Sequence, residues 1–160
     1  MTVNLQESQS RSSTDRIEKK LVLRASRARV WRALSNAEEF ATWFGVKLDG
    51  AFAEGATLRG DVTHSNGSHI CTIDMRIERM EAERYFSYRW HPYPIDPAVD
   101  YSVEPTTLVE FTLDEVEGGT SVTIVESGFD AIPLARRAEA FRMNDQGWGG
   151  QINNLARYVE

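Results

Sequence analysis

The chain has very little cysteine. Cys71 is the only thiol in 160 residues, which excludes an internal disulfide and a metal site made of several thiolates. The three histidines, His64, His69 and His91, lack the close spacing with which one helix or strand presents two histidines to a metal ion. We therefore expect no metal centre, and we interpret Cys71 as a buried small hydrophobic residue rather than a nucleophile.

Motifs that bind phosphates or activate a nucleophile are also missing. No GxSxG, GxGxxG or P-loop occurs in the sequence. Their absence argues against acyl transfer by serine, nucleotide hydrolysis and dinucleotide cofactors. We expect the protein to act without a cofactor.

Positive charge and long apolar runs are scarce. The formal net charge is −6, which argues against nucleic acid as a partner because phosphate binding requires a basic surface. No apolar run approaches the roughly 20 residues that span a bilayer, so we expect no membrane insertion.

Residues 1–15 lack the basic and apolar regions of a signal peptide. They predict a disordered polar tail before a single domain at 16–160, and a cytoplasmic location.

Most of the remaining chain alternates apolar and polar residues with a period of two, which is typical of half-buried strands. The clearest example is His69–Met80, and it follows an Asn66-Gly67 pair that favours a tight hairpin turn. The predicted strands are Arg16–Arg24, Lys47–Asp49, Ala56–His64, His69–Met80, Glu83–His91, Leu108–Asp114 and Thr120–Ser127.

Helical signals lie near the start and at the end of the chain. Ser26 and Asn36 are N-cap residues for two short helices, and Gly45 ends the second. Pro133 favours the first turn of a long helix within Ile132–Glu160. The apolar face of this last helix comprises Phe141, Trp148, Ile152, Leu155 and Val159, at helical spacing.

The last helix also carries residues that a buried face should not contain. Asn144 and Asp145 fill the step between Phe141 and Trp148, and three glycines follow at positions 147–150. Each glycine costs a helix interior about 1 kcal/mol relative to alanine. One interpretation is a kinked helix whose glycines admit a backbone or a ring at close range. The other is that Asn144 and Asp145 face a cavity.

A long connection separates the fifth and sixth predicted strands. This segment, Pro92–Pro105, holds four of the five prolines. Connections of this length are uncommon inside a compact domain and are often binding loops or lids. The two alternatives are a lid over a binding site and a simply flexible connection.

Three segments carry a resemblance to a known family. They are RVWRALSNAEEFATWFG at Arg29–Gly45, VEFTLDEVEGGTSVTIVESGF at Val109–Phe129 and GWGGQINNLARYVE at 147–160. Together they resemble the SRPBCC superfamily. Within it they are similar to the AHSA1-like branch, which shares the C-terminal domain of the activator of the Hsp90 ATPase. The resemblance covers residues 16–160.

The resemblance implies an α+β helix-grip fold of the START or Bet v 1 type. In this fold a curved antiparallel sheet wraps around a long C-terminal helix, two short helices follow the first strand, and a cavity lies between sheet and helix. Members bind lipids, sterols, polyketides or other small apolar molecules, a few catalyse cyclisation or dehydration, and eukaryotic relatives stimulate a chaperone. Because binders and enzymes share the fold, the resemblance does not specify a reaction.

Two positions depart from the pattern of this branch. Relatives commonly carry histidine at the positions of Asn144 and Glu126 in this sequence. A proton-transfer role that rests on those histidines is therefore not implied for this chain.

Alternation along the last strand sends Glu126 to the same side as Val122 and Ile124, toward the cavity. A carboxylate desolvated there would have a raised pKa and could move protons, so Glu126 and Asp145 are the candidate catalytic residues. The alternative for Glu126 is a strand end that reaches water or an arginine and does no chemistry. His64 would also point inward by alternation, although a solvated histidine is more common beside a turn. The predicted ligand-binding residues are Trp43, Met75, Phe86, Tyr88, Trp90, Phe111, Glu126, Phe141, Asn144, Asp145 and Trp148, with Met143 beside them.

Three functional hypotheses follow. The leading one is a protein that binds a small hydrophobic or aromatic molecule in the cavity between sheet and helix. The alternatives are a polyketide cyclase-like or dehydratase-like enzyme that uses a cavity carboxylate, and a protein-interaction module that regulates a chaperone. An edge strand also leaves room for a homodimer.

Overall fold

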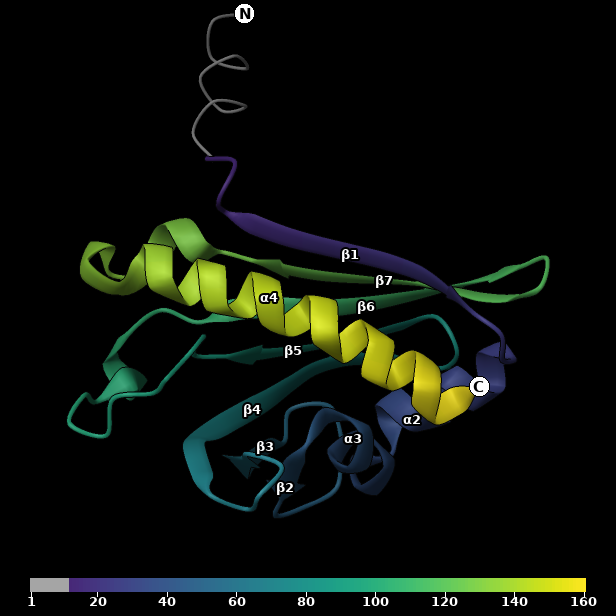
Figure 1. Ribbon diagram of the computed structural model, residues 1–160, viewed down its shortest axis with the longest axis horizontal. Coiled ribbons are helices and arrows are strands. Elements are labelled where there is room, and N and C mark those ends of the chain that lie inside the picture. Colours follow the sequence, from purple (N-terminus) through teal and green to yellow (C-terminus); the bar gives the residue numbers. More distant parts are fainter. Residues whose placement is uncertain (1–11) are drawn as a thin grey trace, which may run out of the picture.

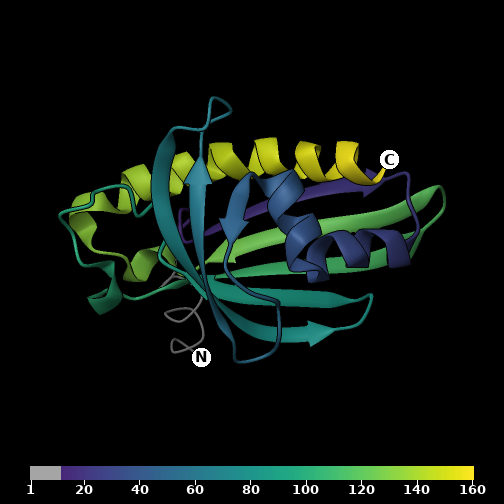
Figure 2. The same cartoon turned by 90° about the horizontal axis from the view of Figure 1, so that it is seen from below.

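A seven-stranded antiparallel sheet forms the frame of the protein. The computed structural model describes residues 12–160, and the strand order is β1-β7-β6-β5-β4-β3-β2. The strands are β1 (Arg16–Leu23), β2 (Val46–Leu48), β3 (Thr57–Thr63), β4 (His69–Glu81), β5 (Tyr85–Trp90), β6 (Thr107–Val116) and β7 (Gly119–Ser127). The sheet curves strongly, so that β2 and β3 turn toward the long helix (Figures 1 and 2). The predicted helix-grip fold is confirmed.

Within residues 12–160, three α-helices cover the concave face of the sheet: α2 (Arg27–Ser35), α3 (Ala37–Phe44) and α4 (Leu134–Val159). The first two begin as predicted. Ser26 Oγ accepts from the Arg29 amide at 3.1 Å, and Asn36 Oδ1 accepts from the Glu39 amide at 3.0 Å. These bonds satisfy amides that a helix leaves free in its first turn. Short 3₁₀ turns occur at Tyr101–Val103 and Phe129–Ala131.

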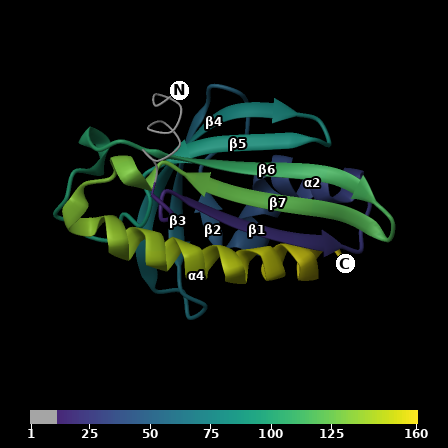
Figure 3. The same cartoon turned by 90° about the horizontal axis from the view of Figure 1, so that it is seen from above.

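The long helix α4 runs alongside β1 and across the sheet without interruption (Figures 1 and 3). The predicted kink is therefore wrong. A Cβ atom built on Gly147, Gly149 or Gly150 would meet nothing within 4 Å, so these glycines do not admit a closely packed backbone or ring either. Trp148, Ile152 and other buried residues of the predicted stripe hold the helix in place instead.

Part of the segment expected to be a disordered tail makes specific contacts. Residues 1–11 of the predicted tail lie outside the described residues, but residues 12–15 make specific contacts. The Ser12 amide and hydroxyl donate to the Asp130 carboxylate at 2.9 and 2.6 Å, and the Asp130 amide donates to Asp15 Oδ1 at 3.1 Å. The segment before β1 is thus attached to the turn that precedes α4.

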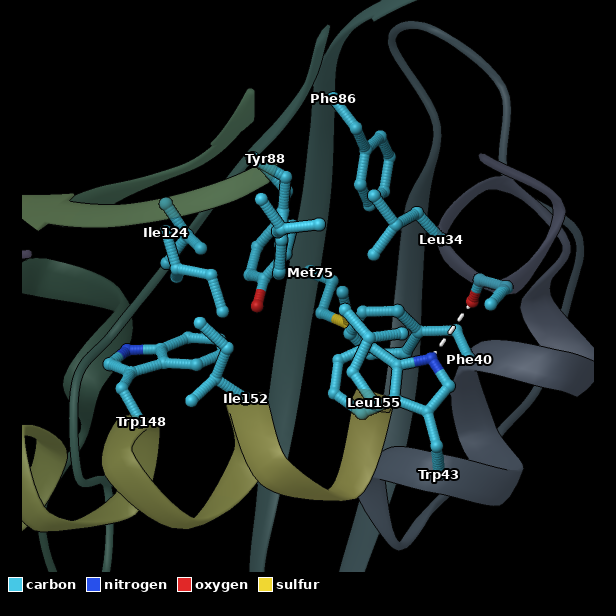
Figure 4. Close-up of a cluster of buried hydrophobic side chains, with 14 of the residues drawn as sticks. Leu34, Phe40, Trp43, Met75, Phe86, Tyr88, Ile124, Trp148, Ile152 and Leu155 are labelled. Carbon is cyan, nitrogen blue, oxygen red and sulfur yellow. Dashed lines mark hydrogen bonds between the residues drawn. The ribbon is translucent and has the colours of Figure 1, made fainter. Parts of the chain in front are cut away.

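Aromatic side chains fill most of the space between sheet and helices. Phe40 of α3 lies at the centre, with its ring centroid 6.2 Å from that of Tyr88 and 6.5 Å from those of Phe86 and Phe111. All four are completely buried, and Figure 4 shows the cluster. A large part of the expected cavity is therefore packed core. Within residues 12–160, no helix combines the length and apolar character needed to cross a bilayer.

Candidate functional site

An open pocket remains at one end of the sheet, where β4, α4 and the β5–β6 connection meet. Its volume is about 180 Å³. The lining consists of Phe44 from α3, Val62 from β3, Ile70, Cys71 and Ile73 from β4, Trp90 from β5, His91, Tyr93 and Pro94 from the connection, and Asn144, Gly147, Trp148 and Gln151 from α4. Most of the exposed lining surface is apolar.

Three aromatic rings form one wall of this pocket. The indole rings of Trp90 and Trp148 lie 5.8 Å apart at an angle of 30°. The Phe44 ring lies 6.0 Å from Trp90 and 5.9 Å from Trp148, in edge-to-face geometry with both. Each ring packs against the two others, and together they offer an apolar, aromatic wall to a ligand.

Glu126 lies behind the two indoles and is completely buried. Trp148 Nε1 donates to Oε1 at 2.8 Å, and Trp90 Nε1 donates to Oε2 at 2.8 Å. Thr107 Oγ1 donates to Oε2 at 2.6 Å, while Asn144 Nδ2 lies 3.0 and 3.2 Å from the two oxygens. Each partner presents a donor to the carboxylate, which is an acceptor when ionised.

Burial is the largest influence on the protonation of Glu126. It raises the pKa of this carboxyl group above the ordinary glutamate value, although the bonds from Thr107, Trp90, Trp148 and Asn144 act in the opposite direction. The carboxylate of Glu126 also influences the nearby Tyr88 hydroxyl. Burial, with a contribution from the negative charge of Glu126, raises the pKa of Tyr88 well above its ordinary value.

The Tyr88 hydroxyl has no hydrogen-bond partner within residues 12–160, although it is buried. It points toward α4 (Figure 4). A buried hydroxyl without a partner costs about 1–3 kcal/mol. The region behind the indoles is therefore polar but closed, whereas the pocket in front of them is apolar and open.

The sequence model of the family described as "Activator of Hsp90 ATPase homolog 1-like protein" matches residues 24–160. The chain belongs to this AHSA1-like family. No curated protein matches it significantly in sequence.

Solved structures resemble the AHSA1-like chain over nearly its whole length. Protein MLL2253 from Mesorhizobium loti is 22% identical, with coverage of 90% of this chain and 96% of that one, at a TM-score of 0.70. The Aha1 dimer of Colwellia psychrerythraea is 17% identical, with coverage of 91% and 96%, at a TM-score of 0.67. DynU16, a protein in the dynemicin biosynthetic locus, is 23% identical, with coverage of 91% of this chain and 47% of that one, at a TM-score of 0.69. These similarities show the fold.

The AHSA1-like structure brings together only part of the predicted site. Trp90, Asn144 and Trp148 line the pocket, and Glu126 lies directly behind them. Tyr88 lies deeper, near the charge of Glu126. The other aromatic and apolar candidates are packed core rather than pocket lining: Trp43, Met75, Phe86 and Phe111.

Asp145 does not face the cavity, and that prediction is wrong. Its carboxylate forms an ion pair with Lys19 of β1 at 3.0 Å, and 47% of the side chain is exposed. One residue along a helix turns the side chain by about 100°, so Asp145 faces β1 while Asn144 faces Glu126. Phe141 packs on Phe129 at 5.3 Å, away from the pocket.

His64 does not point inward either. It is exposed and its amide donates to Ser68 O at 2.8 Å in the β3–β4 turn. Met143 is half-buried and lies outside the pocket lining. Among residues 12–160, no group of three His, Cys, Asp or Glu side chains gathers in a way that could hold a metal ion.

The β5–β6 connection contributes pocket residues that sequence reasoning missed, namely His91, Tyr93 and Pro94. Two further hollows, of about 260 and 420 Å³, lie under the same connection and share Pro94 with the pocket. The proline-rich composition was the available signal for this segment, but its path over β4 depends on tertiary contacts.

Arg136 of α4 provides those contacts. Its Nη1 donates to Pro92 O at 2.7 Å, and its Nε donates to Glu104 Oε1 at 2.9 Å. The guanidinium carbon lies 4.7 Å above the centre of the Tyr101 ring. One arginine therefore holds both ends of the β5–β6 connection against the start of α4.

Proposed function

We propose that this AHSA1-like protein binds a small hydrophobic, aromatic molecule in the pocket between α4, β4 and the β5–β6 connection. The observation that carries the proposal is the convergence of Phe44, Trp90 and Trp148 on one open, mostly apolar space. Ligand sites are typically concave and apolar, with a few polar groups that orient the ligand. Here Asn144 and His91 supply such groups.

The size of the pocket supports a compact ligand. Its volume of about 180 Å³ is close to that of an apolar cavity of about 150 Å³ that accepts benzene. A molecule with one aromatic ring therefore fits the space, with the ring stacked against the indoles. The β5–β6 connection contributes His91, Tyr93 and Pro94 to the lining, which supports the interpretation of this segment as a lid.

The enzyme hypothesis has less support. DynU16 belongs to a biosynthetic locus, and a buried carboxylate could act as a general acid in a cyclase-like or dehydratase-like reaction. However, Glu126 is enclosed by Trp90, Trp148, Thr107 and Asn144, and the indoles separate it from the pocket. Asp145 lies outside the pocket lining. A bound ligand meets the indoles first, so we favour binding over catalysis.

Two partner predictions remain from the sequence. One is dimerisation, which is supported by the dimer of the similar Colwellia Aha1 structure and by the terminal positions of β1 and β2 in the sheet. The other is a chaperone-regulating role, which is supported by the family description alone. Neither depends on the pocket, so both are separable from ligand binding.

The test introduces a larger side chain from α4 into the pocket. Gly147 lines the pocket and a Cβ there meets no atom within 4 Å, so the Gly147→Leu side chain would occupy the ligand space. Gly150→Leu is the matched control, because Gly150 is exposed, equally unobstructed and outside the pocket lining. Toluene binding is measured by ligand-observed NMR and by tryptophan fluorescence.

We expect Gly147→Leu to weaken toluene binding at least tenfold and Gly150→Leu to leave it unchanged. Circular dichroism confirms that both variants remain folded. Equal binding by both variants would place the ligand elsewhere. An absence of binding by the parent protein, for toluene and for other one-ring probes, would refute the proposed function.

A further inference from the structure

The polar atoms around the pocket restrict which ligand fits it. Besides the Cys71 thiol and the indole N–H groups that bind Glu126, four lining residues carry polar side-chain groups: His91, Tyr93, Asn144 and Gln151. The Gln151 amide is already engaged, because its Nε2 donates to Phe44 O at 2.8 Å and its Oε1 accepts from Asn154 Nδ2 at 3.1 Å. The Tyr93 hydroxyl can adapt to a donor or an acceptor on the ligand, so the orientation of Asn144 and His91 decides where the lining offers an acceptor alone.

Asn144 is held in one orientation by Glu126. The two indole N–H groups of Trp90 and Trp148 can only donate, so both oxygens of Glu126 act as acceptors. Asn144 consequently presents its NH₂ group to them, at 3.0 and 3.2 Å. If the amide were flipped, Asn144 Oδ1 would face the carboxylate oxygens of Glu126, and no hydrogen bond could form between these acceptors. The Asn144 Oδ1 atom is thus turned away from Glu126, and no hydrogen bond within residues 12–160 uses it.

His91 offers a second acceptor. Its Nε2 lies 3.0 Å from the carbonyl oxygen of Glu104. A carbonyl oxygen only accepts, so Nε2 carries the hydrogen and Nδ1 of the neutral ring is an acceptor. No hydrogen bond in the described part of the chain uses Nδ1. Asn144 Oδ1 and Nδ1 of the neutral His91 ring are therefore acceptors, whereas the Tyr93 hydroxyl can donate as well as accept.

We propose that the pocket selects a one-ring aromatic molecule that donates a hydrogen bond, of the phenol or aniline class, and that Asn144 Oδ1 is the specificity-determining acceptor. Glu126 is the positioning residue that fixes this acceptor. The inference rests on the proposed function and specifies its ligand class. Selection arises because a ring without a donor covers Oδ1 and leaves it without water or a partner, which is costly.

The test compares phenol, anisole and toluene by titration calorimetry on the full chain. Phenol donates a hydrogen bond, anisole only accepts, and toluene does neither. We expect phenol to bind at least tenfold more tightly than anisole. The same ratio in Asn144→Leu, which has similar side-chain size but no acceptor, should fall to near one. Solvation differences between the probes are the same for both proteins and cancel in this comparison.

Glu126→Gln gives a second readout that a merely structural role would not change. A glutamine at this position no longer presents two acceptors, so the Asn144 amide can turn and offer its NH₂ group to the ligand. The phenol-to-anisole ratio should therefore decrease because anisole gains affinity. Because the ratio compares two ligands on the same variant, a loss of affinity that affects both ligands equally does not change it.

The outcomes separate the two proposals. If anisole binds as tightly as phenol while Gly147→Leu abolishes both, the pocket binds ligands but the inferred selection is wrong. If the ratio survives in Asn144→Leu, the assignment to Asn144 is wrong. If none of the three probes binds the parent protein, the proposed function itself fails. Should Asn144→Leu not fold, the pair aniline and N,N-dimethylaniline tests the same selection on the parent protein alone.

Discussion

The side-chain amide of Asn144 in α4 donates to both carboxylate oxygens of Glu126 in β7, at 3.0 and 3.2 Å. These are the two positions at which the resemblance described in the sequence analysis implies histidine. The structure shows that the two departures form one interaction. Loss of the Glu126 carboxylate would leave the half-buried Asn144 amide without this acceptor, whereas loss of Asn144 would leave Glu126 with its donors Trp90, Thr107 and Trp148.

The pH dependence of stability should reveal Glu126. Burial raises its pKa in the folded protein above the ordinary value of 4.5, so between these two values the native state binds more protons than the unfolded chain. Stability from this group is therefore greatest at low pH and decreases as pH rises through that interval. Glu126→Gln removes this dependence.

Urea unfolding of both proteins from pH 4 to pH 8 provides the measurement. We expect the free energy of unfolding of the parent, minus that of the variant, to decrease with rising pH. Other groups titrate alike in both proteins and cancel. A difference that increases with pH would mean that the four hydrogen-bond donors outweigh burial.

Alanine should stabilise α4 at two of its glycines. Gly147 and Gly150 lie in the helix interior, and a Cβ at either meets nothing within 4 Å. Each Gly→Ala change should add about 0.5–1 kcal/mol to the free energy of unfolding. Gly45→Ala is the control, because its space is equally open but its φ of +85° disfavours alanine. Urea denaturation should show an increased free energy of unfolding for the two helix variants and a decreased one for Gly45→Ala.

Gly119 in the last hairpin should tolerate no side chain. Its φ is +152°, and a Cβ there would lie 1.9 Å from the backbone oxygen of Leu23. Gly118, with φ +89°, has open space around it, so Gly118→Ala should cost only the roughly 1–2 kcal/mol of a left-handed residue. Gly119→Ala should cost clearly more, because the β1–β7 edge must move. Thermal unfolding of both variants measures the difference, and equal costs would contradict the observed close approach.

Arg136 should control the motion of the β5–β6 connection. Arg136→Ala removes contacts to Pro92, Tyr101 and Glu104. Amides of residues 95–104 should then exchange with deuterium about tenfold faster, equivalent to roughly 1.4 kcal/mol of lost protection. Arg142→Ala, an exposed arginine on the same helix, should leave exchange unchanged. Identical exchange in the two variants would show that other contacts hold the connection.

The elements themselves could be predicted because local signals agreed with the fold. The caps at Ser26 and Asn36 appear as expected, and β4 differs from its predicted range by one residue. The start of β5 was less accurate, at Tyr85 rather than Glu83. Glu83 adopts a positive φ of 62° in the preceding turn, and a glutamate gives no sequence signal for that conformation.

The site was harder to predict because it depends on contacts between distant segments. Alternation placed Glu126 on the inner face, and the structure agrees that it is buried. The two-residue alternation of the strand could not reveal that Trp90 and Trp148 enclose Glu126. Likewise, the helical pattern could not decide which of Asn144 and Asp145 faces inward, since that depends on where Lys19 of β1 lies. The ligand-binding and catalytic roles of all these residues remain predictions.

Cys71 lines the pocket and is the only cysteine of the sequence. The protein therefore carries a single natural attachment point for a thiol-reactive fluorophore at the proposed binding pocket, with no engineered residue required. Burial raises the pKa of this thiol, so labelling should proceed slowly at neutral pH and faster under alkaline conditions, where the thiolate forms. A dye attached there would sense solvent polarity beside Trp90 and Trp148, and the labelled protein would serve as an optical reporter of pocket occupancy.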